Sequence, residues 1–168
     1  MPRPRRPIKP ENRHVLGVAV VTFSQEPQDL LWPSRIELTS LLLAESAQVS
    51  DGKLFVMGGG FDCLRGRLPT GLDASVAMIL AVPWPLLEVP YRLQLELADA
   101  DGAVAGGFRL RAELESTPPA GWREGAPLTV PLVFPVRAEL GEPGRYAVRC
   151  LIEGEERGRV AFEVEQAA

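Results

Sequence analysis

The stretch YRLQLELADADGAVAGGFRLRAELE, residues 91–115, alternates apolar and polar side chains on both sides of a turn signal. Before the turn, apolar side chains occupy every second position from Tyr91 to Leu97, and after it they do so from Phe108 to Leu114. A period of two is typical of half-buried strands, and Asp-Gly is a common hairpin turn. The stretch therefore predicts an antiparallel hairpin with one core face and one wet face, where opposite charges can pair across the strands.

The residues upstream continue this pattern of short strands separated by turns. Asp51 and Gly52 form a second Asp-Gly pair, which predicts a hairpin turn between two further apolar runs. We expect a strand over most of 36–47, a turn at 49–52, its partner strand at 53–64, a loop at 65–73 and a buried strand at 74–84.

Downstream, a proline-rich loop at 116–127 leads into LTVPLVFPV at 128–136. Because proline cannot donate to a strand ladder, this run is expected at the edge of a sheet. The last run, 144–165, alternates again and predicts a third hairpin with Tyr146 and Cys150 on its buried face.

Seven or eight short antiparallel strands in about 130 residues predict an all-β fold, an antiparallel β-sandwich of immunoglobulin-like architecture. A small β-barrel is the alternative. Tyr146 precedes Cys150 by four residues, whereas the corner tyrosine of immunoglobulin domains precedes its cysteine by two, so the likeness is to the architecture alone. We expect a single sandwich domain at 35–166 and a disordered or loosely attached leader at 1–34, which an upstream start codon could have added.

The run Gly58, Gly59 and Gly60 is the feature most similar to a phosphate-binding loop. A P-loop needs a following Lys and Ser or Thr, and a dinucleotide fingerprint needs a third glycine where Cys63 stands. No helical pattern follows whose N-terminal N–H groups could hold a phosphate. We interpret the three glycines, like the Asp51-Gly52 turn, as structural.

Charge is spread unevenly along the chain. Residues 1–14 carry five basic groups and one acid, which leaves the remaining residues with a net charge of −8. An acidic body argues against nucleic-acid binding. No window approaches 18 apolar residues, so no membrane-spanning helix is expected. Without the pattern of a signal peptide, we expect a cytoplasmic protein with both cysteines, Cys63 and Cys150, reduced.

Few residues offer catalytic chemistry. The only histidine is His14, in the leader, which excludes a histidine-dependent triad and makes a metal site improbable for the body. We therefore expect no catalytic residue, no metal and no cofactor, although a carboxylate pair acting as an acid and base stays open. Trp84 and Trp122 lie in predicted loops, where an aromatic side chain can either contact a partner or plug the core. Trp122, Arg123 and Trp84 are the candidate partner or ligand contacts.

The stretches SLLLAESAQVSDGKLFVMGGGFD, VPW and PGRYAVRCLIEGEERGRVAFEV resemble a bacterial family of small proteins classed as a domain of unknown function. The likeness covers roughly residues 36–165, and AQVSDGKL with the glycine run is its most specific part. The resemblance implies a compact β-domain and no activity or ligand. We expect a non-enzymatic interaction or accessory module with an unknown protein partner; a sandwich that binds a small ligand or carbohydrate through loop aromatics is the alternative.

Overall fold

A computed structural model describes residues 14–16, 19–21 and 34–167 of the chain. Contacts divide the chain into two units, residues 1–31 and 32–168. In the first unit, β1 (His14–Leu16) pairs in antiparallel fashion with β2 (Ala19–Val21). Apart from these two strands, the predicted leader at 1–34 falls almost entirely outside the described residues.

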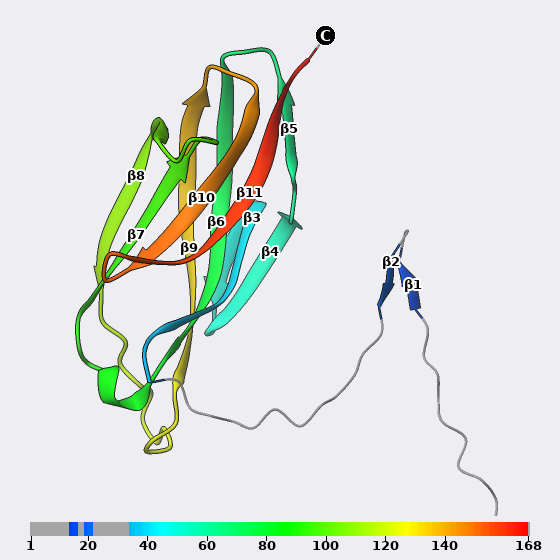
Figure 1. Cartoon of the computed structure of the whole chain (residues 1–168). Helices are drawn as coiled ribbons and strands as arrows, with labels where there is room; N and C mark the ends of the chain where they lie inside the picture. Colours follow the sequence, from blue (N-terminus) through cyan, green and yellow to red (C-terminus); the bar gives the residue numbers. More distant parts are fainter. Residues whose placement is uncertain (1–13, 17–18, 22–33, 168) are drawn as a thin grey trace, which may run out of the picture. The chain divides into compact units, whose positions relative to one another are not determined.

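The second unit is a β-sandwich of two sheets (Figure 1). One sheet has the strand order β4-β3-β6-β9 and the other the order β5-β11-β10-β7-β8. The predicted all-β sandwich is thus confirmed, and its strands pair in antiparallel fashion except at one edge of the five-stranded sheet. The elements of this unit are β3 (Glu37–Ser50), β4 (Lys53–Gly59), β5 (Cys63–Gly66), β6 (Thr70–Val82), η1 (Trp84–Leu86), β7 (Tyr91–Ala98), β8 (Val104–Leu114), β9 (Leu128–Leu140), β10 (Gly144–Ile152) and β11 (Glu155–Gln166).

The hairpin predicted from residues 91–115 forms as β7 and β8, with Tyr91 opposite Leu114 and Leu95 opposite Leu110. Its register shifts near the turn, beyond Glu96. Within the described residues the only helical segment is the 3₁₀ turn η1, and no helix there is long enough to cross a membrane.

The sequence predicted a single strand at 53–64, and this prediction is wrong. The run divides into β4 and β5, which belong to different sheets. The predicted loop at 65–73 is also wrong at both ends, because β5 continues to Gly66 and β6 begins at Thr70. The sandwich consequently has nine strands, one more than the upper number expected. β5 pairs in parallel with β11, a pairing between distant segments that local alternation cannot reveal.

The predicted edge position of the proline-containing strand is confirmed, since β9 ends the four-stranded sheet. Pro131 and Pro135 lie opposite Ile79 and Ser75 of β6, its only neighbour in that sheet. The strand continues to Leu140, four residues beyond the predicted end.

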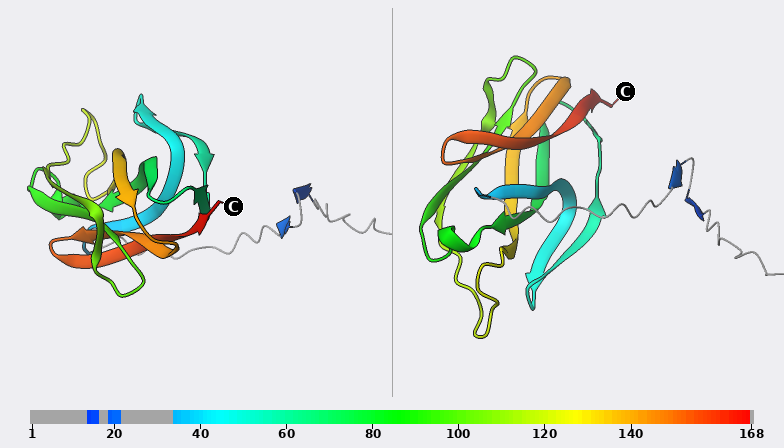
Figure 2. Two further views of the ribbon diagram at one scale, coloured as in Figure 1. Left: turned by 90° about the horizontal axis from the view of Figure 1, so that it is seen from above. Right: turned by 60° about the horizontal axis from the view of Figure 1, so that its bottom comes forward.

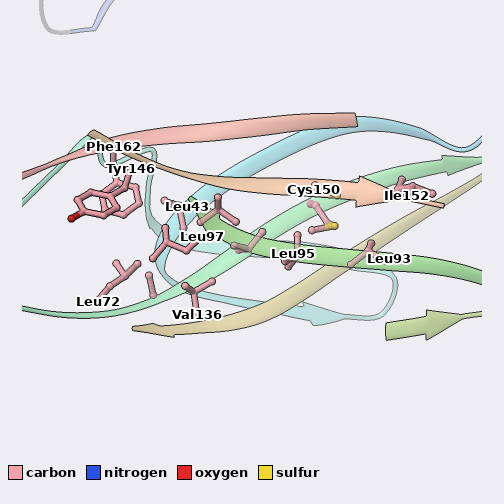
Figure 3. Close-up of a cluster of buried hydrophobic side chains, with 14 of the residues drawn as sticks. Leu43, Leu72, Leu93, Leu95, Leu97, Val136, Tyr146, Cys150, Ile152 and Phe162 are labelled. Carbon is pink, nitrogen blue, oxygen red and sulfur yellow. The ribbon is translucent and has the colours of Figure 1, made fainter. Parts of the chain in front are cut away.

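The core lies between the two sheets and is built from alternate residues of their strands (Figure 3). β6 and β7 supply half of its buried residues, because every second side chain on each is buried. Tyr146 of β10 stacks on Phe162 of β11 with ring centroids 5.9 Å apart. A fully buried Leu or Val stabilises a fold by about 1.5–3 kcal/mol. The largest fully buried side chains are Leu43, Met78, Leu80, Leu93, Leu95, Leu97, Leu140, Ile152, Val76, Val82, Val136 and Val148.

β3 has two different neighbours along its length. Residues 37–44 pair with β6, and residues 44–50 pair with β4. Figure 2 shows β3 curving strongly between these two parts, so that the β3–β4 hairpin extends away from the rest of the four-stranded sheet. Along residues 45–50, β3 therefore has only β4 beside it in the sheet, and β4 has only β3.

Candidate interaction surface

The glycine run forms the bend through which the chain leaves the four-stranded sheet. Gly58 and Gly60 have φ angles of +59° and +81°, a region that L side chains rarely adopt. The Gly60 N–H donates to the carbonyl oxygen of Leu43 at 2.8 Å. Gly59 is needed for a different reason, namely lack of space: a Cβ there would lie 2.8 Å from Val56 Cγ1 and 2.9 Å from Leu42 Cδ1. The next element is β5, a strand, so no helix N-terminus points at this bend.

The turn of the same hairpin lies at Asp51 and Gly52, with φ angles of 50° and 68°. Two successive positive φ angles are those of a type I′ turn, whose twist matches that of paired strands. β3 and β4 thus leave the turn in a fixed register, with Ser50 opposite Lys53 and Gln48 opposite Phe55.

The β3–β4 hairpin exposes large apolar side chains. Met57 is 70% exposed, Phe55 50% and Val49 42%. Phe55 and Met57 are two residues apart on β4 and so lie on the same face of the hairpin, whereas Val49 lies on the opposite face. No ion pair involving this hairpin is found within the described part of the chain. Water is in contact with apolar surface here, which marks the hairpin as a candidate binding site.

The outward face of the four-stranded sheet adjoins the hairpin and is also apolar. Leu43 and Val76 pair with each other and point into the core, so their neighbours in sequence point outward. In register, Leu42, Ala77 and Val133 form one row across the outward face, and Ser40, Ile79 and Pro131 form the next. Charged side chains on this face lie near its ends, at Glu37, at the exposed pair of Asp73 and Arg137, and at exposed Glu139.

The outward face of the five-stranded sheet has the opposite character. Glu96, whose side chain is only 8% exposed, lies 3.2 Å from Arg109 Nε and 3.3 Å from Arg149 Nη1. Arg149 also contacts Glu156, which in turn contacts Arg159 at 2.6 Å. Hydrogen bonds from Arg159 and then Arg149 hold the pKa of Glu156 below its ordinary value. The predicted cross-strand charge pairs are confirmed, and the charges of this network satisfy one another.

A hollow of about 480 Å³ lies where β7 and β8 meet the β10–β11 turn. Two pairs of polar side chains line it: Arg92 contacts Glu153 at 3.0 Å, and Arg111 donates to Gln94 at 3.2 Å. The backbone N–H of Arg92, and then its guanidinium, lower the pKa of the Glu153 carboxyl. Paired groups of this kind stabilise the hairpins, and the hollow contains neither a nucleophile nor a base beyond these carboxylates.

The three residues proposed from sequence as contacts lie on two loops at one end of the sandwich (Figure 1). The loops are joined directly, since the N–H of Glu88 donates to the carbonyl oxygen of Ser116 at 3.0 Å. Trp84 opens η1 and is half-buried. Trp122 is 37% exposed, and its indole N–H donates to the carbonyl oxygen of Ala126 at 3.2 Å. The turn that follows brings the N–H of Ala126 to the carbonyl oxygen of Arg123, whose side chain is exposed.

The two thiols are free and differ in their surroundings. Burial raises the pKa of Cys150 to about 11, so this thiol is an inert part of the core. Cys63 is half-buried beside Glu165, and its pKa is also raised, first by desolvation and then by that carboxylate. A raised pKa opposes nucleophilic reactivity. Among the described residues no group of three or more His, Cys, Asp and Glu side chains could hold a metal ion.

Sequence reasoning missed the exposed pair Phe55 and Met57. The signal was present in KLFVMGG, residues 53–59, where both sets of alternate positions are apolar. A half-buried strand has one polar face. An edge strand without a polar face exposes apolar side chains on its outward side.

Comparison with known proteins gives a family and no activity. The profile of a family described as "Family of unknown function (DUF6941)" matches residues 39–165. No curated protein matches the chain. Among solved structures, the chain is similar to the Pseudomonas fluorescens alkylpurine DNA glycosylase AlkC bound to DNA containing an abasic site analog, with 14% identity and a TM-score of 0.40. The match covers 78% of this chain and 30% of that chain, and a similarity this low says nothing about function.

Proposed function

Because the chain belongs to the DUF6941 family of unknown function, no activity comes from its relatives, and we propose from its own surface that it is a non-enzymatic protein-interaction module. The observation that carries the proposal is the exposure of Phe55 and Met57 on the β3–β4 hairpin. The proposal includes an immunoglobulin-like architecture, supported by the hydrogen bond of Tyr146 to the backbone four residues upstream. It also includes the bacterial cytoplasm, which suits two unpaired thiols.

The distribution of polar groups supports binding over catalysis. The charged face of the five-stranded sheet is occupied by its own ion pairs, and Glu96 at its centre contacts two arginines. No ion pair within the described residues involves the apolar β3–β4 hairpin. Burying one large apolar side chain at an interface contributes about 1.5–3 kcal/mol, so Phe55 and Met57 together could anchor a partner.

Site-specific photocrosslinking of the full chain tests this proposal. A photoreactive amino acid is placed at position 57 in one protein and at position 104 in another, and each is expressed in a bacterial host. Val104 is a matched control because it is an exposed apolar residue, 40% accessible, on an edge strand of the other sheet. We expect a discrete crosslinked protein from position 57 alone, lost when Phe55 is changed to Ser. Equal crosslinking from both positions would contradict the proposal.

A second candidate function rests on Trp122, an exposed indole beside Arg123 on a loop. Aromatic side chains in such positions can stack on a sugar or a small planar ligand. A thermal-shift screen with a panel of carbohydrates tests it, because a ligand bound only to the folded state raises the melting temperature. A shift that Trp122→Ala removes would support this candidate; no shift across the panel would count against it.

A further inference from the structure

The two sheets have four edge strands, and three of them carry features that oppose pairing with another chain. β9 contains Pro131 and Pro135. β8 carries arginines in its centre, and a register shift interrupts its pairing near Gly106 and Gly107, which both have positive φ angles. β5 has only four residues. Prolines, charges, irregular backbone and short length are the usual means by which proteins protect sheet edges.

β4 is the unprotected edge. Residues 54–57 contain no proline and no charge, and none of them has a positive φ angle. Only β3 pairs with this strand in its sheet, so the backbone groups along its other side have no strand partner among the described residues. An apolar edge strand of this kind is a template for a further strand.

We propose that β4 pairs in antiparallel fashion with β4 of a second copy of this chain, joining two four-stranded sheets into one of eight strands. The proposal rests on the proposed role of the β3–β4 hairpin as an interaction surface. A two-fold axis at Val56 places Phe55 opposite Met57 of the second copy, and Met57 opposite its Phe55. A thioether beside an aromatic ring is a favourable contact, and four large side chains would then cover one another.

A second copy suits this edge because the strand is complementary to itself. In a two-fold interface, a residue near the axis lies close to the same residue of the second copy. A charge near the axis would therefore face a like charge, and this strand has none there. The charges closest to the axis lie at opposite ends of the paired segment and differ in sign. Lys53 begins β4, and the Glu45 carboxyl lies over Gly58 near its other end, where a Cβ would be 2.6 Å from Glu45 Cδ. In this register Lys53 lies opposite Gly59 of the second copy, at the end of β4 over which the Glu45 carboxyl of that copy lies.

Sedimentation equilibrium of the full chain over a concentration series that reaches the millimolar range tests the proposal. We expect a monomer–dimer equilibrium. Met57→Lys should raise the dimer dissociation constant by about tenfold or more, because it puts two cations close to the axis, and Phe55→Glu should do the same with two anions. The double variant Phe55→Glu with Met57→Lys should restore dimerisation, since each glutamate then faces a lysine of the other copy. Val104→Lys, on a different edge strand, should have no effect.

Three results would overturn the proposal: a monomer throughout the series, a dimer that Met57→Lys leaves unchanged, or failure of the double variant to regain what the single variants lose. Circular dichroism of each variant shows whether it is folded, which is expected because both side chains are at least half exposed. A monomer that still crosslinks to another protein from position 57 would overturn the dimer and leave the proposed function standing. A monomer without such a crosslink would count against both.

Discussion

The hydroxyl of Tyr146 donates a hydrogen bond to the carbonyl oxygen of Glu142, 2.9 Å away and four residues upstream. The ring of Tyr146 is buried against Phe162, while its hydroxyl reaches the connection between β9 and β10. This bond fixes the corner at which the chain passes from one sheet to the other. Burial raises the pKa of the Tyr146 phenol, and the negative charges of Glu142 and Asp99 raise it further. The hydroxyl therefore stays protonated and acts as a donor.

Removal of this hydroxyl should destabilise the sandwich. In Tyr146→Phe the ring packing is kept, while the Glu142 carbonyl loses its donor, so we expect the free energy of unfolding to fall by about 1–2 kcal/mol. Urea denaturation followed by circular dichroism measures the change, and an unchanged slope with denaturant would show that compactness is preserved. A variant as stable as the wild type would show that the corner bond has no role in stability.

The sequence predicted the sandwich because its best signals are local. Alternation in residues 91–115 and two Asp-Gly turns identify strands that pair with their neighbours in sequence, and these pairings form as expected. The strand that escaped prediction, β5, pairs with residues of β11 that lie 100 positions further along the chain. Pairing of such distant segments depends on tertiary packing, which no short window of sequence contains.

The candidate surface was less accessible to sequence reasoning for a related reason. An apolar side chain in a strand is normally buried, so the residue types alone do not distinguish Phe55 and Met57 from core residues. Phe55 and Met57 are exposed because they lie opposite Ser46 and Gln48, on the same side of the sheet as Ala44, which faces away from the core. For Trp122 the sequence left both a partner contact and a core plug open, and its side chain is 37% exposed.

Substitutions at two glycines of the bend distinguish the stability cost of backbone strain from that of side-chain crowding. Gly60 has a positive φ angle and open space around it, whereas Gly58 has a positive φ angle and a Cβ position only 2.6 Å from Glu45. Gly60→Ala should therefore cost about 1 kcal/mol, and Gly58→Ala about 1–3 kcal/mol. Chemical denaturation of both variants measures the difference. Adding Glu45→Ala to Gly58→Ala should remove the excess, and an excess that persists would show that Glu45 is not its cause.

The ion network on the five-stranded sheet predicts a specific dependence on pH. Glu156 has a lowered pKa in the folded state, so its pairing with Arg159 and Arg149 stabilises the fold above its ordinary pKa of 4.5. This contribution is lost as the pH falls through the folded-state value. Glu156→Gln should then cost about 1 kcal/mol at neutral pH and nothing in strongly acidic buffer. Denaturation across the acidic range measures this, with Glu163→Gln as an exposed control; a cost that does not change with pH would contradict the prediction.

The two loop tryptophans should differ in fluorescence. Proteins that keep only Trp84 or only Trp122 isolate each emission spectrum. We expect a redder maximum for Trp122, which is 37% exposed, than for half-buried Trp84. Trp84→Ala should also cost more stability than Trp122→Ala, about 2 kcal/mol against less than about 1 kcal/mol. A bluer emission from Trp122 than from Trp84 would exclude it as an exposed contact.

Hydrogen exchange of the β4 amides, measured on the full chain at a low and a high protein concentration, tests the central claim most directly. Amides on an unpaired edge exchange quickly, and pairing with a second copy protects them. We predict that amides within residues 53–59 become protected at high concentration while those of the proline-containing edge β9 do not change, and that Met57→Lys abolishes the effect. Exchange of β4 that is the same at both concentrations would contradict the claim that this strand is where the protein binds its partner.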